Sequence, residues 1–347
     1  MKFFKWLTFS IVGIFLVACT NTENYCVKTQ KRAIGVVLPM SSNASKDVID
    51  GMKLALQEIN QAVDKKNSFS LVFRNSENPS GVLKEIELLF LQDVRVFCIG
   101  FDKEVILSHK LLSSMGASFF NFMMTYPPAT LNSKTSTRIF LNASQEADLL
   151  ASVVKGKQDV KRIAILSEDS FIGKSVGDYL NFSVANAERK IYRDYFNVGE
   201  KSFEIYASQI TVQNPSVIYY IGSGAEFSAL QKALKQSGFK GKVLKNRGYS
   251  LYENSANGVS VKYNCEQFKT GLSKTFQEKF VKVYSRKPSL FSAYGYDSIK
   301  LLVNAMDKSN FEISDMRKFF VNKIYNGASG ELMFDSSADC TAELSLK

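Results

Sequence analysis

The sequence predicts an α/β protein with two doubly wound lobes and an N-terminal tether. Short β-branched runs alternate with amphipathic helices along most of the 347 residues, in two successive series. Repeated β-α units of this kind indicate a parallel sheet covered by helices on both faces. The chain is also long for a single hydrophobic core, because one core rarely grows past ~250 to 300 residues. Two lobes are therefore expected.

The first series begins with the β-branched run RAIGVVLPM at residues 32–40. A helix is predicted over 47–60, where Val48, Met52 and Ile59 share one face. A loop follows the last strand of the series, because Pro127 and Pro128 exclude a helix there. The remaining elements of the first series are expected as strands at 68–76, 94–100 and 117–124, and helices at 82–91 and 109–115.

The second series repeats the pattern and ends in a helical region with a terminal hairpin-like segment at 327–339. Gly238 is expected to end its helix as a C′ glycine. The strands are predicted at 161–169, 190–198, 216–222, 242–248 and 258–264, and the helices at 174–187, 203–210, 225–238, 272–286, 293–306 and 314–324.

The N-terminus has the pattern of a secretory signal peptide over residues 1–18. Lys2 and Lys5 give a positive start, and the apolar run at 7–18 is short for a permanent membrane span. The run ends in LVAC, which resembles the bacterial lipobox and makes Cys19 the expected acylated N-terminus of the mature chain. Residues 19–31 are polar and aperiodic, as expected of a lipidated tether.

The expected location is therefore the cell envelope, on the periplasmic face of a bacterial membrane to which the chain is held by acyl chains such as palmitate. Each buried acyl CH₂ contributes roughly 0.8 kcal/mol, so two or three chains hold stably. Thr20, rather than Asp, follows the cysteine and permits outer-membrane delivery. The sequence leaves open which membrane carries the protein.

Composition and motifs argue against several function classes. The formal net charge is +11, but the lysines are scattered and form no arginine-rich stripe, so no nucleic-acid partner is expected. The chain has one histidine, His109, in a helical stretch, which excludes histidine-rich metal sites. The sequence contains no glycine-rich phosphate loop and no G-x-S-x-G motif. We therefore expect no enzyme activity, no metal and no cofactor.

Four cysteines remain after Cys19, and an exported protein permits disulfides between them. Cys98 lies in the apolar run VRVFCIG and is expected to be a buried thiol. A bridge between Cys265 and Cys340 is one pairing that the sequence leaves open, and Cys26 belongs to the tether.

Five segments in order resemble the type I periplasmic solute-binding proteins of the leucine/isoleucine/valine-binding family. IGVVLPM followed by DGMKLALQEIN is similar to the family's first strand and helix, and RIAILSEDSFIGKSVGDYL resembles the opening of its second lobe. PSVIYYIGSGAEFSALQKALKQSGFKGKVL, AYGYDSIKLLVNAM and GASGELMFDSSAD resemble later segments. The resemblance spans about Arg32 to Asp339.

The resemblance implies two Rossmann-like lobes of the periplasmic binding protein-like I fold, joined by three hinge crossovers near Leu141, Tyr249 and Asn326. Lobe 1 would combine residues 32–142 with 268–325, and lobe 2 would combine 143–267 with 326–347. The ligand would lie between the lobes, at the carboxyl ends of the strands.

Loops that follow the predicted strands supply the candidate ligand-binding residues. Ser42 and Asn43 have an alternative role as helix caps, and Phe171 has one in core packing. On the lobe 1 side the candidates are Ser41, Ser42, Asn43, Asp102, Glu104, Thr125 and Tyr126, and on the lobe 2 side they are Asp169, Phe171, Ser223, Glu226, Arg247 and Tyr249.

The chain departs from the grip that the resemblance implies for a free amino acid. Family members hold the carboxylate with a serine and a threonine, and the ammonium with an acidic residue and tyrosines. Only Thr125 matches plainly, FDKEV stands at the serine loop, and Arg247 stands near the acidic position. Hydrogen bonds to charged groups contribute roughly 1.5 to 3 kcal/mol each, so such losses favour another solute, such as an acidic one that faces Arg247, or no solute.

Two functions remain as alternatives. The first is the receptor of an ABC importer, which binds a small polar solute such as an amino acid and delivers it to a permease and ATPase complex. The second is an outer-membrane lipoprotein that uses the same fold to bind and regulate a protein such as a cell-wall synthase. Thr20 favours the second, and the two-lobe pattern without an added helical repeat favours the first.

Overall fold

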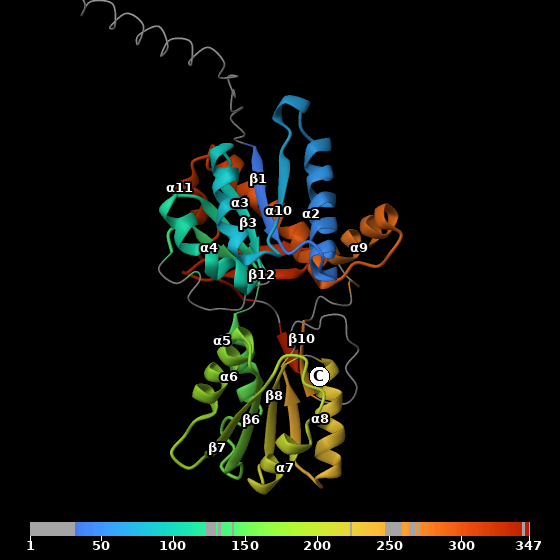
Figure 1. Cartoon of the computed structure of the whole chain (residues 1–347). Helices are drawn as coiled ribbons and strands as arrows, with labels where there is room; N and C mark the ends of the chain where they lie inside the picture. The colour runs from blue at the N-terminus through green and yellow to red at the C-terminus, as the bar shows by residue number, and fades with distance from the viewer. Residues whose placement is uncertain are drawn as a thin grey trace, which may run out of the picture.

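The protein forms two lobes arranged along one axis (Figure 1). The computed structural model describes residues 32–122, 130, 133–140, 142–222, 224–246, 259–263, 268, 271–341 and 344–346. The expected signal peptide (1–18), Cys19 and the expected tether (19–31) lie outside the described residues. No helix in these described ranges is long and apolar enough to cross a membrane.

The first lobe is built on a parallel five-stranded sheet with the order β2-β1-β3-β4-β5. Every residue of β1, β3, β4 and β5 is buried, as expected for parallel strands covered on both faces. The strands are β1 (Ala33–Leu38), β2 (Ser70–Asn75), β3 (Val96–Gly100), β4 (Ser118–Phe122) and β5 (Ser136–Arg138).

Helices cover both faces of this sheet. One core joins β1 to α2 and α10 through residues such as Val36, Met52 and Leu302, and another joins the opposite face to α3 and α4 through Val37, Ile86 and Leu112. The helices of the first lobe are α2 (Asn43–Gln61), η1 (Lys65–Asn67), α3 (Pro79–Leu91), α4 (Asp102–Ser114), α9 (Gly271–Tyr284), α10 (Leu290–Lys308), α11 (Ile313–Met316) and η4 (Arg317–Phe319).

The second lobe has a six-stranded sheet with the order β14-β10-β9-β8-β6-β7, in which only β14 is antiparallel to its neighbour. Its cores lie on the two faces of β6 and β8. Its elements are α5 (Ala143–Ser152), β6 (Arg162–Glu168), α6 (Phe171–Val184), β7 (Lys190–Phe196), α7 (Glu204–Val212), β8 (Val217–Ile221), α8 (Gly224–Gln236), β9 (Lys242–Lys245), β10 (Val259–Tyr263) and β14 (Leu344–Leu346).

The C-terminal hairpin packs on the first lobe, and this corrects the expected lobe boundary at 325/326. β11 (Ile324–Gly327), β12 (Gly330–Phe334) and β13 (Cys340–Thr341) form a small antiparallel sheet. Leu332, Phe334 and Cys340 lie in the same core as β1 and α10. Only β14, which pairs with β10, returns to the second lobe.

The predicted helix at 314–324 is also wrong in part. The helical region ends with η4, and β11 begins at Ile324. Asn322 has a left-handed φ of 54°, which a regular helix excludes. The second half of the predicted helix is therefore a turn that leads into the hairpin.

The chain passes between the lobes three times, between Phe140 and Asn142, between Tyr263 and Phe268, and between Thr341 and Leu344. The second passage follows β10, so the expected position near Tyr249 is too early, and the third lies beyond the expected Asn326. β5 and β10 both end just before a passage. The carboxyl ends of both parallel sheets therefore face the other lobe (Figure 1).

The described cysteines are buried and unpaired. Cys98 in β3 and Cys340 in β13 are free thiols, and burial raises the pKa of each above its ordinary value. The prediction of a buried Cys98 is confirmed. A bridge to Cys340 is not formed.

Candidate functional site

Several helices begin at the strand ends that face the opposite lobe. α2 and α4 follow β1 and β3 in the first lobe, and α6 and α8 follow β6 and β8 in the second. The first turn of a helix carries main-chain N–H groups without intrahelical partners and a partial positive charge. The interlobe side of both lobes is therefore suited to an anionic group of a ligand.

The loop after β1 is arranged by the first turn of α2 and by Glu77. Ser42 is the N-cap of α2, and its Oγ accepts a hydrogen bond from the N–H of Ser45 at 3.0 Å. The N–H of Ser41 donates to Glu77 Oε1 at 2.6 Å. Hydrogen bonds from Ser41 and Asn75 hold the pKa of Glu77 below its ordinary value. Of the predicted residues here, Ser42 is a helix cap, whereas Ser41 and Asn43 are exposed.

Glu104 occupies the first turn of α4 as a buried carboxylate. Only 5% of the residue is exposed, and Ser76, which follows β2, donates to its Oε1 at 3.1 Å. The positive end of the helix stabilises a carboxylate at this position. Glu104 thus ties two neighbouring loops of the first lobe together. Asp102 is the first residue of α4, and its side chain lies outside the described atoms.

The segment SEDSF runs from the end of β6 to the first residue of α6. Ser170 is the N-cap of α6, with its Oγ 3.1 Å from the N–H of Gly173. Asp169 forms an ion pair with Lys174, and this contact raises the pKa of Lys174. The neighbouring Phe171 is 43% exposed, so it does not belong to the core.

Glu226 and Glu168 bring two carboxyl groups to the interlobe side of the second lobe. Glu226, in the first turn of α8, is 7% exposed and accepts a hydrogen bond from the N–H of Gly199 at 2.6 Å. Glu168 ends β6. Burial raises the pKa of Glu168, and the negative charge of Glu226 raises it further. A hydrogen bond with Ser170 lowers this pKa and so opposes both effects.

The remaining predicted site residues are not covered by the structure. Thr125, Tyr126, Ser223, Arg247 and Tyr249 lie outside the described residues.

Two residues near these positions were missed by sequence reasoning. Glu168 directly precedes the predicted Asp169, and its place as the last strand residue could have indicated it. Asn246, which is 2% exposed, accepts from the N–H of Gly222 at 3.0 Å and so joins the ends of β8 and β9.

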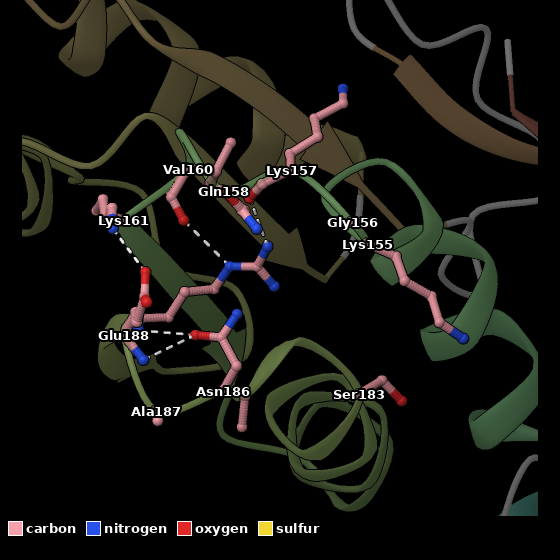
Figure 2. Close-up of a pocket in the computed structure, with 12 residues that line it drawn as sticks. Lys155, Gly156, Lys157, Gln158, Val160, Lys161, Ser183, Asn186, Ala187 and Glu188 are labelled. Atoms are coloured by element: carbon pink, nitrogen blue, oxygen red, sulfur yellow. Dashed lines mark hydrogen bonds and ion pairs between the residues drawn. The ribbon is translucent and has the colours of Figure 1, made fainter.

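A separate hollow of about 540 Å³ lies at the end of the second sheet away from the first lobe, beside the amino ends of β6 and β7 (Figure 2). Arg189 donates hydrogen bonds there to the main-chain oxygens of Val154, Lys157, Val160 and Val184. Lys161 and Glu188 form an exposed ion pair at its rim. The guanidinium organises two loops, and this hollow is remote from the interlobe side.

The described residues offer no metal centre. No group of three or more His, Cys, Asp or Glu side chains within them could hold a metal ion. His109 lies on α4 with its ring 5.5 Å from that of Phe119, in an edge-to-face contact.

The sequence matches a family model described as periplasmic binding protein over residues 32–338, so the chain belongs to this family. No curated protein matches it in sequence.

Several solved structures share the fold at low sequence identity. A leucine-binding protein of Thermotoga maritima is 18% identical, with a TM-score of 0.75, over 90% of this chain and 94% of that one. A branched-chain amino acid transporter substrate-binding protein of Streptococcus pneumoniae, in complex with isoleucine, is 16% identical, with a TM-score of 0.74, over 90% and 94% of the two chains.

A third similar structure contains a different kind of ligand. It is an ABC transporter solute-binding protein of Rhodopseudomonas palustris in complex with 3,4-dihydroxybenzoic acid. This protein is 15% identical, with a TM-score of 0.75, over 91% of this chain and 92% of that one. The two-lobed type I fold expected from the sequence is thus confirmed.

Proposed function

We propose that this protein is a lipid-anchored solute-binding receptor of an ABC importer, and that it binds an amino acid or a related carboxylate between its lobes. The observation that carries the proposal is that both parallel sheets turn their carboxyl ends, and the N-termini of helices that follow these strands, towards the other lobe. Strand ends of this kind are where α/β sheets bind ligands. A permease and ATPase complex would be the partner.

A carboxylate is the favoured ligand group on electrostatic grounds. The N-termini of α2 and α4 in the first lobe and of α6 and α8 in the second favour negative charge. The similar proteins of known structure include binders of isoleucine and of 3,4-dihydroxybenzoic acid, which both carry a carboxylate.

An amino acid is favoured over a simple aromatic acid by the second lobe. Glu168 and Glu226 interact closely enough for the charge of one to raise the pKa of the other. A ligand ammonium beside them would relieve this repulsion, and hydrogen bonds to charged groups contribute roughly 1.5 to 3 kcal/mol each. An acidic solute that pairs with Arg247 is the competing ligand class.

Calorimetry with leucine, isoleucine, glutamate, benzoate and 3,4-dihydroxybenzoate tests the proposal. We expect micromolar binding of an amino acid, which corresponds to about 8 kcal/mol. Glu226→Gln should weaken binding about tenfold or more, while its amide oxygen can still accept from Gly199. Glu188→Gln, at the remote hollow of the same lobe, is the matched control and should bind normally. The absence of binding across the whole panel would contradict the proposal.

The affinity for an amino acid should also depend on pH through Glu168. Its pKa is raised above the ordinary 4.5, so part of the population stays protonated at pH values where a free carboxyl is ionised. A ligand ammonium favours the ionised form, and we therefore expect affinity to rise as pH increases through the raised pKa of Glu168. Glu168→Gln should bind more weakly and lose this component of the pH profile, and an identical profile in the variant would rule Glu168 out.

The alternative of an outer-membrane lipoprotein that binds a protein is favoured by one observation, Thr20 after the acylation site. Affinity purification of the anchored protein from envelope membranes separates the two functions. Recovery of permease and ATPase subunits supports transport, and recovery of a cell-wall synthase supports the alternative.

A further inference from the structure

The two lobes are joined by side chains as well as by the main chain next to the first and third crossovers. Asn142 Nδ2 donates to Asp339 Oδ2 at 3.3 Å, and Gln145 Nε2 donates to the main-chain oxygen of Cys340 at 3.4 Å. Asn142 and Gln145 belong to the start of α5 in the second lobe. Asp339 and Cys340 belong to the segment that packs on the first lobe. These contacts therefore bridge the lobes.

The first-lobe side of this bridge is a buried ion pair. Arg138, whose side chain is 0% exposed, contacts Asp339 through Nε–Oδ1 at 2.6 Å and Nη2–Oδ2 at 3.1 Å. Its Nη2 also donates to Thr130 Oγ1 at 3.2 Å, and its main-chain N–H donates to the oxygen of Ala338 at 3.1 Å. A bidentate pair shielded from water is strong and directional. Asp339 is thus held firmly in the first lobe.

The second-lobe side is fixed by a capping box. Asn142 Oδ1 accepts from the N–H of Gln145 at 3.1 Å and from Ser144 Oγ at 2.6 Å, while Gln145 Oε1 accepts from the N–H of Asn142 at 3.2 Å. The amide oxygen of Asn142 is therefore committed to α5, and its NH₂ group faces Asp339. One side chain links the start of α5 to the ion pair of the other lobe.

The apolar cores do not oppose a rotation of one lobe against the other. Each hydrophobic cluster among the described residues draws its members from a single lobe. The angle between the lobes is therefore set near the crossovers, where polar contacts dominate.

We propose that Asn142 is the pivot of interlobe motion, a positioning residue that sets the angle of α5 against the Arg138–Asp339 pair and hence the proportion of closed molecules. The consequence for solute affinity rests on the proposed function, but the pivot itself does not.

Asn142→Asp tests the pivot. The variant keeps a good N-cap for α5, loses the donor to Asp339 and introduces a like charge beside it. Spin labels at the exposed Lys110 in α4 and Lys235 in α8, introduced as noncanonical amino acids, report the interlobe distance by pulsed electron resonance. We expect the ratio of the distance populations in the ligand-free, full-length protein to change about tenfold, as for the loss of a charged hydrogen bond.

Asn186→Asp is the matched control, because it makes the same substitution in the second lobe at the remote hollow, where Asn186 Oδ1 accepts hydrogen bonds from the N–H groups of Glu188 and Arg189. Its distance distribution should equal that of the wild type. Asn142→Ser provides a second variant that keeps a capping oxygen without a charge, and it should shift the populations in the same direction. The proposal that Asn142 is the pivot would be overturned if the interlobe distance distributions of both Asn142 variants superimposed on that of the wild type.

Solute binding is measured separately. If the wild type binds a member of the amino-acid panel, the apparent Kd of the Asn142 variants should change by the same factor as the closed population. If no panel compound binds, the proposed function fails, and the distance measurement still decides whether Asn142 is the pivot.

Discussion

Asp297 is a carboxyl group that the fold buries almost completely, in the middle of α10. It accepts hydrogen bonds from the N–H of Ala328 at 2.8 Å, from the N–H of Ser329 at 2.7 Å and from Ser329 Oγ at 2.6 Å. Burial raises its pKa to about 6 from an ordinary 3.8, although these bonds oppose the shift. Asp297 therefore anchors the turn between β11 and β12 at an electrostatic cost.

Because the ionised form of Asp297 is disfavoured by burial, we expect the free energy of unfolding of the protein to depend on pH. Between pH 4 and 6 the folded protein binds the proton of Asp297 more tightly than the unfolded chain, so this contribution to stability falls as pH rises through that window. We expect a loss on the order of 2 kcal/mol. In urea unfolding, the free energy of unfolding of the wild type should be lower at pH 7.5 than at pH 4.5. Asp297→Asn should lack this decrease.

Asp315→Asn is the control for this measurement. Asp315 is half-exposed, and a hydrogen bond with Lys318 lowers its pKa, so its contribution to stability is constant above pH 4.5 and is lost only at lower pH. The prediction would be contradicted if the difference in free energy of unfolding between the wild type and Asp297→Asn were the same at pH 4.5 and pH 7.5.

At the scale of elements, helices α2 and α10 pack so closely where they cross that their backbones are in contact. A Cβ on Gly51 would lie 1.9 Å from the main-chain oxygen of Ser292, and one on Gly295 would lie 2.3 Å from that of Val48. Two helices that carry much of the first-lobe core therefore meet through glycines, one on each helix.

Gly51→Ala should separate these helices and destabilise the protein. Overpacking costs about 1 to 3 kcal/mol, which exceeds the gain of up to about 1 kcal/mol in helix propensity. Gly81→Ala in α3 is the control, because a Cβ there meets no atom closer than 3.9 Å, and this variant should be neutral or more stable. Equal unfolding midpoints of Gly51→Ala and the wild type would show that the contact relaxes freely.

At the scale of the whole molecule, β1 begins at the pole of the first lobe that lies away from the second lobe (Figure 1). The Arg32 guanidinium lies 4.9 Å from the ring of Phe69 and 4.6 Å from that of Phe311, and it pairs with Asp307. These contacts fix the start of the folded body. The interlobe side therefore lies at the other end of β1 from Arg32.

The proposed anchor predicts the behaviour of a Cys19 variant. Cys19→Ser should remove acylation and move the protein from the membrane pellet to the soluble fraction, because two or more acyl chains provide the stable attachment. Incorporation of an alkyne-labelled palmitate measures the modification directly. Cys26→Ser should stay in the pellet and keep the label, and a Cys19→Ser protein that still pellets would exclude this anchor.

The βα units could largely be predicted from hydrophobic periodicity. β6 and α6 follow directly from RIAILSEDSFIGKSVGDYL, and Gly238 has the left-handed φ of 77° expected at the end of α8. The short β5 and α5 were not predicted. β5 has three residues and includes Arg138, so its sequence lacks the apolar run that marks a buried strand.

The candidate site was predicted at the level of loops. Ser41, Asp169, Phe171 and Glu226 lie at strand ends on the interlobe side, as expected from the order of elements. The partners of these residues could not be predicted, because Glu226 meets Glu168 and Gly199 only once β6, β7 and β8 are aligned in one sheet.

The sequence alone determined the alternation of strands and helices and the two-lobed family fold, because each is encoded in neighbouring residues. The lipid anchor at Cys19 stays a prediction of the sequence. Only the tertiary structure decided which side chains meet beside the crossovers between the lobes. Arg138 and Asp339 are 201 residues apart, and their pairing depends on the packing of the C-terminal hairpin against the first lobe. Local periodicity carries no information about which distant residues meet, since this is set by sheet order and by the docking of whole elements.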